Sequence, residues 1–179
     1  MAIHKLLLLP GDGIGPEVMA EVKRLIDWLN GRRLAHFETE QGLVGGSAYD
    51  AHRVSITEDT MARAKAADAV IFVTPEYDHA PPPSLINALI YLSQEWAHKP
   101  VGFVSYGGPA GGTRAVQMVK PMLAGLKLVP LFESVIAPLF TKSITDGKFN
   151  ASELQETQGR GMLDALAKWV TALAPMRAG

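Results

Sequence analysis

The sequence predicts a doubly wound α/β domain, in which helices cover both faces of a parallel sheet. Short apolar runs alternate with amphipathic stretches along the chain, and this alternation is typical of parallel βαβ units. The 179 residues fit one domain of ordinary size, and 47% of them are hydrophobic, which is enough for a core. No internal repeat or low-complexity linker interrupts the sequence, so we expect residues 1–179 to form a single domain.

Two strands are expected in the first third of the chain. The first is the apolar run Leu6 to Leu9, and the second is the more polar stretch Leu34 to Glu40, expected at a sheet edge. Between them we expect a helix, because apolar residues recur there at helical spacing on one face. This face consists of Val18, Val22, Leu25, Ile26 and Leu29. Gly42 to Val54 is expected to be a loop, with Gly45-Gly46 as a breaker.

Three further strands and their helices continue the alternation. Thr57 is expected to cap a helix over residues 60–66, and Pro121 lies inside a later helix, where it removes one backbone hydrogen bond. Asp146-Gly147 marks a turn. The remaining elements are strands at Ala69 to Val73, at Val101 to Ser105 and from Leu128, an extended segment at Pro81 to Pro83, and helices around Leu85 to Leu92, Ala115 to Leu126 and Leu163 to Leu173.

This succession of five strands and their helices predicts a flavodoxin-like three-layer sandwich. Its five-stranded parallel sheet is expected to have the order 2-1-3-4-5. Such sheets bind ligands beyond the carboxyl ends of the strands, where the strand order reverses. The loops expected to carry function are therefore Pro10 to Pro16, Thr74 to Pro83 and Ser105 to Gly112.

The loop after the first strand is rich in glycine and leads into a helix, whose free N–H groups could receive a phosphate. Asp12 and Glu17 oppose an anion there, and the loop contains no serine, threonine or arginine. The spacing matches neither a Walker loop nor G-x-G-x-x-G. An ordinary strand-to-helix turn, with Pro16 in the first helical turn, is an equally good interpretation. The candidate cofactor-binding residues are Gly11, Gly13, Ile14 and Gly15.

The loops after the third and fourth strands are better candidates for binding a planar heterocycle. In the first of them, four prolines restrict the backbone and Tyr77 offers an aromatic face. In the second, four glycines leave the backbone uncovered by side chains, so that a flat ligand could approach closely. The alternatives are a rigid loop that orders the next helix, a subunit contact, or plain flexibility. The candidate cofactor-binding residues are Thr74, Pro75, Glu76, Tyr77, Asp78, Ser105, Tyr106, Gly107 and Gly108.

Composition and spacing argue against several functions. The net charge of −1 gives no reason to expect binding to nucleic acid or to a membrane, and the absence of cysteine excludes disulfides and a thiol nucleophile. The histidines show no metal-like spacing and the serines lack a nucleophile-elbow context, so we name no metal site and no catalytic residue. The leading apolar run is too short for a signal peptide, and a cytoplasmic protein is expected.

From about Ala64 to Trp169 the chain resembles the NADPH-dependent FMN reductase family. The resemblance rests on ordered motifs, namely Ala67 to Tyr77, Leu85 and Asn87, Lys99 to Gly108, and Gly111 to Val116. It implies a flavodoxin-like fold, bound FMN, NADPH or NADH as co-substrate, and a homodimer or homotetramer. It also implies that the flavin ring rests against Thr74 to Asp78 and Ser105 to Gly108. The family usually has asparagine where Asp78 stands.

The N-terminal part, about Ile3 to Val70, resembles isopropylmalate or tartrate dehydrogenase instead. The motifs are Leu9 to Val18, Leu43 to Asp50, and Ala67 to Val70, the last of which suits both families. We therefore interpret the chain as a chimera. The substrate-binding and catalytic residues of those dehydrogenases come from later in their chains and are absent here. The first loop also departs from the Gly-Ser-x-Arg character with which FMN reductases hold the flavin phosphate.

These observations lead to the hypothesis of an NAD(P)H:FMN oxidoreductase that passes hydride to FMN or a quinone-like acceptor. The alternative is a catalytically inactive scaffold, a folded chimera whose phosphate site is weakened or lost. A third interpretation is that the loop Gly11 to Gly15 binds a different nucleotide.

Overall fold

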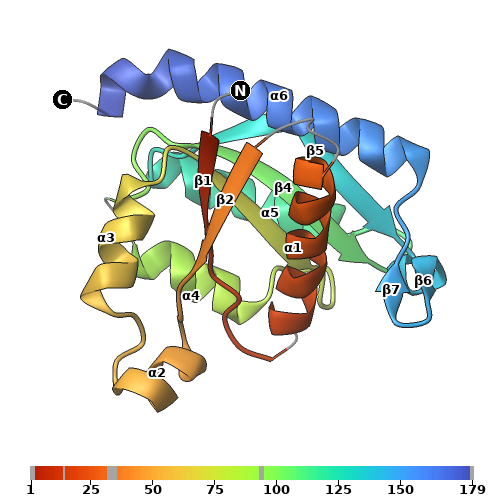
Figure 1. The fold of residues 1–179 in the computed structure, drawn as a ribbon, viewed down its shortest axis with the longest axis horizontal. Helices are drawn as coiled ribbons and strands as arrows, with labels where there is room; N and C mark the ends of the chain where they lie inside the picture. Colours follow the sequence, from red (N-terminus) through yellow and green to blue (C-terminus); the bar gives the residue numbers. More distant parts are fainter. Residues whose placement is uncertain (1–2, 14, 32–35, 93–94, 178–179) are drawn as a thin grey trace. The chain divides into compact units, whose positions relative to one another are not determined.

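The computed structural model describes residues 3–13, 15–31, 36–92 and 95–177 (Figure 1). The chain divides into two compact units, Met1–Ala67 and Asp68–Gly179. Each contains its own parallel sheet, one of two strands and one of three. Among the described residues, no helix is both long enough and apolar enough to span a bilayer.

The first unit is built on two parallel strands, β1 (Ile3–Leu8) and β2 (His36–Gln41), which pair in register from Ile3 opposite His36. The helix α1 (Gly15–Gly31) connects them, as the spacing of apolar residues predicts. The predicted start of the second strand, at Leu34, lies outside the described residues. The helix α3 (Glu58–Ala66) follows, and the Thr57 hydroxyl accepts a hydrogen bond from the Thr60 N–H at 3.2 Å, which confirms the expected N-cap.

A second helix, α2 (Gly46–His52), lies where the sequence predicts a loop, so that prediction is wrong. Its first two residues, Gly46 and Ser47, donate their N–H groups to the Asp12 carboxylate at 2.6 and 2.7 Å. Asp12 thus satisfies the unpaired donors at the start of the helix from a distant loop. These two bonds lower the pKa of Asp12. Gly45 has a φ of +75°, and a Cβ there would collide with the carboxylate, so the glycine pair begins this helix.

The second unit carries the strands β3 (Val70–Pro75), β4 (Pro100–Gly107) and β5 (Val129–Pro138), all parallel and in the order β3-β4-β5. Three helices belong to the same unit, namely α4 (Pro83–Tyr91), α5 (Thr113–Gly125) and α6 (Glu153–Arg177). The predicted strands and helices of this part of the chain are confirmed, with ends displaced by a few residues or, for β5 and α6, by more.

The helices α5 and α6 pack on opposite faces of this sheet. A Cβ on Gly102 would lie 2.8 Å from the Leu166 side chain of α6, so a bare backbone here lets α6 approach closely. Leu131, Met162 and Leu166 form a buried cluster on that face. Ser105, three residues on from Gly102, faces α5, because successive residues of a strand point to opposite sides. The helix α6 is blue in Figure 1.

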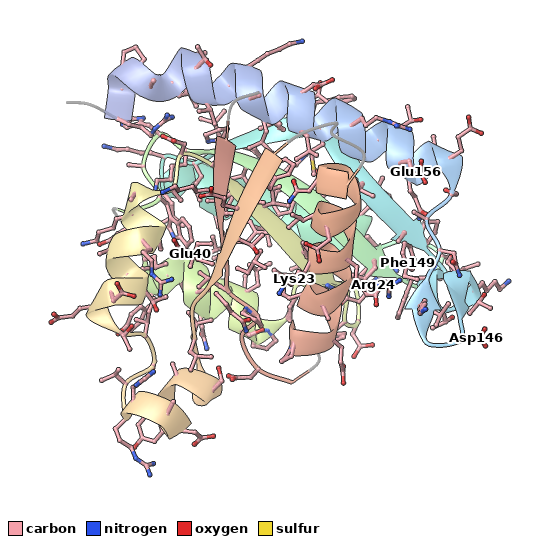
Figure 2. The ribbon with its side chains drawn as sticks, in the orientation of Figure 1. Lys23, Arg24, Glu40, Asp146, Phe149 and Glu156 are labelled. Carbon is pink, nitrogen blue, oxygen red and sulfur yellow. The ribbon has the colours of Figure 1, made fainter. Side chains whose placement is uncertain are left out.

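A short hairpin separates β5 from α6. The 3-10 turn η1 (Phe140–Ser143) leads into β6 (Ile144–Thr145), which pairs antiparallel with β7 (Lys148–Phe149). Asp146 and Gly147 connect them with φ of +51° and +71°. Positive φ at both residues is the geometry that an Asp-Gly sequence favours, and it confirms the predicted turn. Figure 2 shows Asp146 and Phe149 on this hairpin.

Replacing Asp12 by alanine should destabilise α2, because Gly46 and Ser47 would lose their acceptor. We expect the free energy of unfolding to fall by about 0.5–1 kcal/mol, the lower part of the range for N-caps, because the carboxylate is exposed. The pKa of Asp12 is lowered, so this stability is present above about pH 4 and is lost as the pH falls through the folded pKa. Urea unfolding at pH 7 and pH 3 measures both effects. Asp12→Asn, which keeps an acceptor, should lie between the two proteins, and an unchanged alanine variant would contradict the cap.

Candidate functional site

The loops that follow β3 and β4 run beside each other beyond the ends of the strands. Pro75 stands opposite Tyr106 at the end of the β3–β4 ladder. The next residue, Glu76, donates its N–H to the Tyr106 carbonyl at 3.0 Å. The two loops that the sequence singles out in this unit are therefore joined by backbone pairing where they begin.

A tight turn shapes the first of these loops. Tyr77 and Ala80 exchange both backbone hydrogen bonds, at 3.0 and 2.9 Å. The two residues between them, Asp78 and His79, have φ of +47° and +70°. Positive φ at both central residues defines a type I′ turn, and Asp and His enter the left-handed region more readily than most residues. The stiffness expected from prolines therefore also has a second cause, which is this turn.

The Glu76 carboxylate fixes this loop to the start of α5. It accepts hydrogen bonds from the Arg114 N–H at 3.1 Å and from Nε at 2.6 Å, and it also contacts Nη2. The Glu76 side chain is only 4% exposed. Hydrogen bonding to Arg114 holds the pKa of Glu76 below its ordinary value, although desolvation acts in the opposite direction. The carboxylate is committed to this pair, so Glu76 can offer a ligand its backbone rather than its charge.

Arg114 also reaches the turn itself. Its Nη1 lies 2.8 Å from Nε2 of His79. A guanidinium can only donate, so Nε2 of His79 is the acceptor in this contact. Arg114 therefore bridges the β3 loop at two points. Arg114 is not among the residues predicted for the site. The signal that could have found it is a cation at the first turn of a helix, where an acidic partner makes it favourable.

Two buried hydroxyl groups donate hydrogen bonds to backbone carbonyls within the loops. Thr74 and Ser105 are each 1% exposed. The Thr74 hydroxyl donates to the Pro75 carbonyl at 3.1 Å, and the Ser105 hydroxyl donates to the Gly111 carbonyl at 2.8 Å. These side chains order the backbone of the site, and they leave its outer surface to other groups.

The glycines of the second loop are required by close packing. Gly112 has a φ of +86°, and a Cβ there would lie 2.8 Å from the Tyr106 N–H nitrogen. Gly111 has a φ of +59°, and its Cβ would lie 2.5 Å from the Ile136 side chain. The alternative of plain flexibility does not explain contacts of this kind. A Cβ on Gly108, in contrast, would meet nothing within 4 Å, so this stretch of backbone is open.

Two tyrosines complete the outer surface of the site. Tyr77 is 53% exposed. Tyr106 is half-buried, and its ring packs edge-to-face against Phe140 with 5.1 Å between centroids. Burial, with a smaller contribution from Tyr77, raises the pKa of Tyr106 to about 12. Its phenol is therefore protonated at neutral pH and can donate a hydrogen bond, but it cannot serve as a base.

The first glycine-rich loop, in the other unit, is poorly equipped to hold a phosphate. The Gly15 N–H, at the start of α1, already donates to the Asp12 carbonyl at 3.1 Å. Pro16 follows and has no N–H to offer. A Cβ on Gly15 would collide with the Pro10 carbonyl, so this glycine serves the turn, while Gly11 and Gly13 adopt positive φ in open space. Ile14, also predicted to bind the cofactor, lies outside the described residues.

Within the described part of the chain, no three histidine, cysteine, aspartate or glutamate side chains gather in a way that could hold a metal ion. The chemistry of the site therefore rests on backbone amides, two phenols and a neutralised ion pair. This donor set suits a flat heterocycle with hydrogen-bonding edges.

The fold is a flavodoxin-like α/β fold, as solved structures of similar architecture show. A flavoenzyme NAD(P)H:(acceptor) oxidoreductase from Paracoccus denitrificans has a TM-score of 0.58 at 18% identity, covering 96% of this chain and 98% of its own. A flavodoxin, WrbA-like protein from Agrobacterium tumefaciens has a TM-score of 0.55 at 16% identity, with the same coverage. At such identities the likeness concerns the fold alone.

The family follows from the sequence match. The model of the NADPH-dependent FMN reductase family matches residues 46–142, which is more than half of the chain. The protein belongs to this family. The match begins before Ala64, where the resemblance was expected to start, and it includes every candidate residue of the loops after β3 and β4.

The second resemblance is also confirmed. The chain is 78% identical to 3-isopropylmalate dehydrogenase of Rhodopseudomonas palustris strain BisB18 over 72 residues, which is 40% of this chain and 20% of that protein. It is also 70% identical to 3-isopropylmalate dehydrogenase 2 of Bradyrhizobium diazoefficiens over 84 residues, which is 45% of this chain and 23% of that protein. This chain thus spans about a fifth of the length of these relatives. It is a chimera of a dehydrogenase-like and a reductase-like stretch.

Replacing Glu76 by glutamine should loosen the site. We expect the free energy of unfolding to fall by about 1–2 kcal/mol at pH 7, because Arg114 loses a charged partner but is itself partly exposed. The pKa of Glu76 is lowered, so the difference should be full above about pH 4.3 and shrink as the pH falls through the folded pKa. Urea unfolding against pH measures this. Asp164→Asn, which removes an exposed carboxylate of α6, is the matched control. Equal effects of the two variants would contradict the role of Glu76.

Proposed function

We propose that this protein is an NAD(P)H-dependent flavin reductase in which the flavin ring lies against the loops after β3 and β4. The observation that carries this proposal is the surface of exposed Tyr77 and open backbone at Gly108, held rigid by the Glu76–Arg114 pair. Membership of the FMN reductase family supports the same cofactor. NADH or NADPH as co-substrate, a homodimer or homotetramer, and a cytoplasmic location belong to the proposal on the strength of that family.

The residues of the site bind and orient, because a bound flavin itself supplies the capacity to accept hydride from a nicotinamide. Tyr77 contributes an aromatic face that can cover part of the ring. The backbone of Asp78 and His79 and the Gly108 N–H offer donors and acceptors in fixed directions, because Tyr77 and Ala80 bond to each other and the Gly108 carbonyl already accepts from Gly111 and Leu139. The protonated phenol of Tyr106 adds a further donor. No side chain is required to act as an acid or a base.

The affinity for flavin is expected to come from the ring rather than from the phosphate. In the described part of the first loop, the Gly15 N–H donates to the Asp12 carbonyl and is not available to a phosphate. Pro16, which has no N–H, and the acidic Glu17 follow at the start of α1. Each charged hydrogen bond that a phosphate would otherwise receive is worth about 1.5–3 kcal/mol. Their loss removes most of the advantage of FMN over riboflavin.

A titration with FMN and riboflavin tests this order of contributions. We expect both ligands to quench in the same concentration range, with dissociation constants within about threefold, because the ring is common to both. A single phosphate contact of the usual strength would instead favour FMN by more than about tenfold. Fluorescence quenching of each flavin measures the constants. A preference of about thirtyfold for FMN would contradict binding led by the ring.

The alternative function is that of a folded chimera without flavin binding, and the chemistry of the first loop favours it. The visible absorption spectrum of the purified protein and the same titration distinguish the two. Binding of neither flavin at high micromolar concentration would support the inactive scaffold. Binding that weakens at least about tenfold in Tyr77→Ala would place the flavin on the proposed surface, since base–aromatic stacking contributes about 1–3 kcal/mol.

Asp78 should tune the potential of a flavin bound at this surface. It is a carboxylate where the family usually has asparagine, and a nearby negative charge disfavours added electron density. Asp78→Asn should raise the two-electron reduction potential by about 20 mV, the equivalent of about 1 kcal/mol for an exposed charge. Asparagine tolerates the positive φ of this position, so the turn should persist. A dye-linked redox titration measures the potential, with Asp146→Asn as control, and an equal shift in both variants would contradict a local effect.

A further inference from the structure

A groove runs along β5 between α5 and α6, and Ser105 and Thr113 at its inner end adjoin the loop after β4. Its volume is about 480 Å³. The groove is lined by Val116 and Lys120 of α5, by Gln158 and Gly161 of α6, and at its rim by Phe132 and Glu133 of β5. All these residues belong to the second unit, so the groove is complete within it.

The strand β5 bulges where it borders this groove. Val101 pairs with Pro130, whereas Phe103 pairs with Ser134, so Gly102 stands opposite three residues of β5. Phe132 lies within this bulged stretch of β5. Its side chain is 93% exposed, the largest value among the large hydrophobic residues that the structure describes. The Phe132 side chain borders the groove, so apolar surface is available at this edge.

The groove is closed to an added β-strand. The Ile136 N–H donates to Oε1 of Gln158 at 3.5 Å, and the Ile136 carbonyl accepts from Nε2 of Gln155 at 3.2 Å. The helix α6 thereby occupies both outward backbone groups of Ile136 with side-chain amides. Pro130, Pro138 and the bulge further break the edge, which are the usual protections against strand addition. The occupant should therefore present a side chain rather than a backbone.

The groove has room and charge for a phenylalanine that is followed by an acidic residue. A Cβ on Gly161 would meet nothing within 4 Å, so the α6 wall leaves space beside the apolar Val116. Lys120 provides a positive charge on the opposite wall. The chain itself carries the matching pair at the rim of the groove, Phe132 followed by Glu133. The protruding Phe132 side chain and the groove thus lie on one surface. A self-complementary contact about a two-fold axis requires this arrangement.

We propose that this groove receives Phe132 of a second copy of the chain, in a reciprocal contact in which Lys120 of each copy faces Glu133 of the other. The proposal concerns assembly and does not depend on flavin binding. The contact buries two phenylalanine side chains and pairs four charges. Both features are repeated by symmetry, so a single substitution acts twice.

Disulfide trapping tests the geometry directly, because the chain contains no cysteine and any disulfide must join two copies. Phe132→Cys and Gly161→Cys proteins are mixed and oxidised. The Gly161→Cys copy keeps its Phe132, so one of the two reciprocal contacts remains, and we expect a crosslinked dimer to form at least about threefold faster than from Met118→Cys mixed with Gly161→Cys. Met118 is 56% exposed on α5 and does not line the groove. Equal rates for the two mixtures, in proteins with unchanged circular dichroism, would overturn the proposal.

Charge reversal tests the pairing between copies. Lys120→Glu alone and Glu133→Lys alone should each slow the crosslinking of the Phe132→Cys and Gly161→Cys pair, because like charges then meet twice. Placing Lys120→Glu on one partner and Glu133→Lys on the other restores attraction at both contacts, and the rate should recover to within about threefold. A contact within one copy would stay repulsive in that mixture. Failure to recover would overturn the assignment of Lys120 and Glu133.

Sedimentation velocity provides the measurement without cysteines. Phe132→Ala should weaken self-association at least about tenfold, as truncation of a central aromatic residue commonly does. Leu154→Ala, which removes an exposed apolar side chain of α6 outside the groove, is the matched control. The same sedimentation profile for both variants would overturn the reciprocal contact.

Discussion

The pairing of Glu76 with Arg114 is the interaction on which the candidate site depends. A carboxylate that is 4% exposed is unfavourable unless a partner neutralises it, and Arg114 does so from the first turn of α5. The same guanidinium reaches His79, so the type I′ turn is held at both of its sides. The glycines at positions 111 and 112 then bring the β4 loop close enough for α5 to begin where Arg114 can make these contacts. The open surface at Tyr77 is the outer side of this arrangement.

Local patterns in the sequence predicted the elements that local forces determine. The apolar runs predicted the strands, Thr57 predicted the start of α3, and Asp146-Gly147 predicted the hairpin turn. What the patterns could not predict comes from contacts between distant residues. Asp12 caps α2 from 34 residues away, so a segment that looks like a loop becomes a helix. Arg114 meets Glu76 across 38 residues. The single five-stranded sheet and the single domain remain predictions, as do the roles of the candidate site residues.

The polar contacts that order each stretch of the chimera lie within its own unit. Asp12 and α2 both lie in the first unit, and Glu76 and Arg114 both lie in the second. No ion pair or hydrogen bond named above needs a partner from the other unit. Secondary structure and loop order can therefore persist in a chimera. A cofactor that takes its ring contacts from one stretch and its phosphate contacts from the other is a harder requirement, because the phosphate loop must bring its own donors.

Negative charges lie in both candidate loops and oppose an anionic group such as a phosphate. Glu76 and Arg114 form an ion pair that also contacts His79, and Asp78 adds a further carboxylate to the same turn. At the first loop, Glu17 stands near the start of α1, where an anion would otherwise be stabilised. Both features work against an anionic ligand, and neither affects the stacking of a neutral ring. In the proposed function, the ring surface of the second unit therefore suits the neutral part of a flavin better than an anionic group.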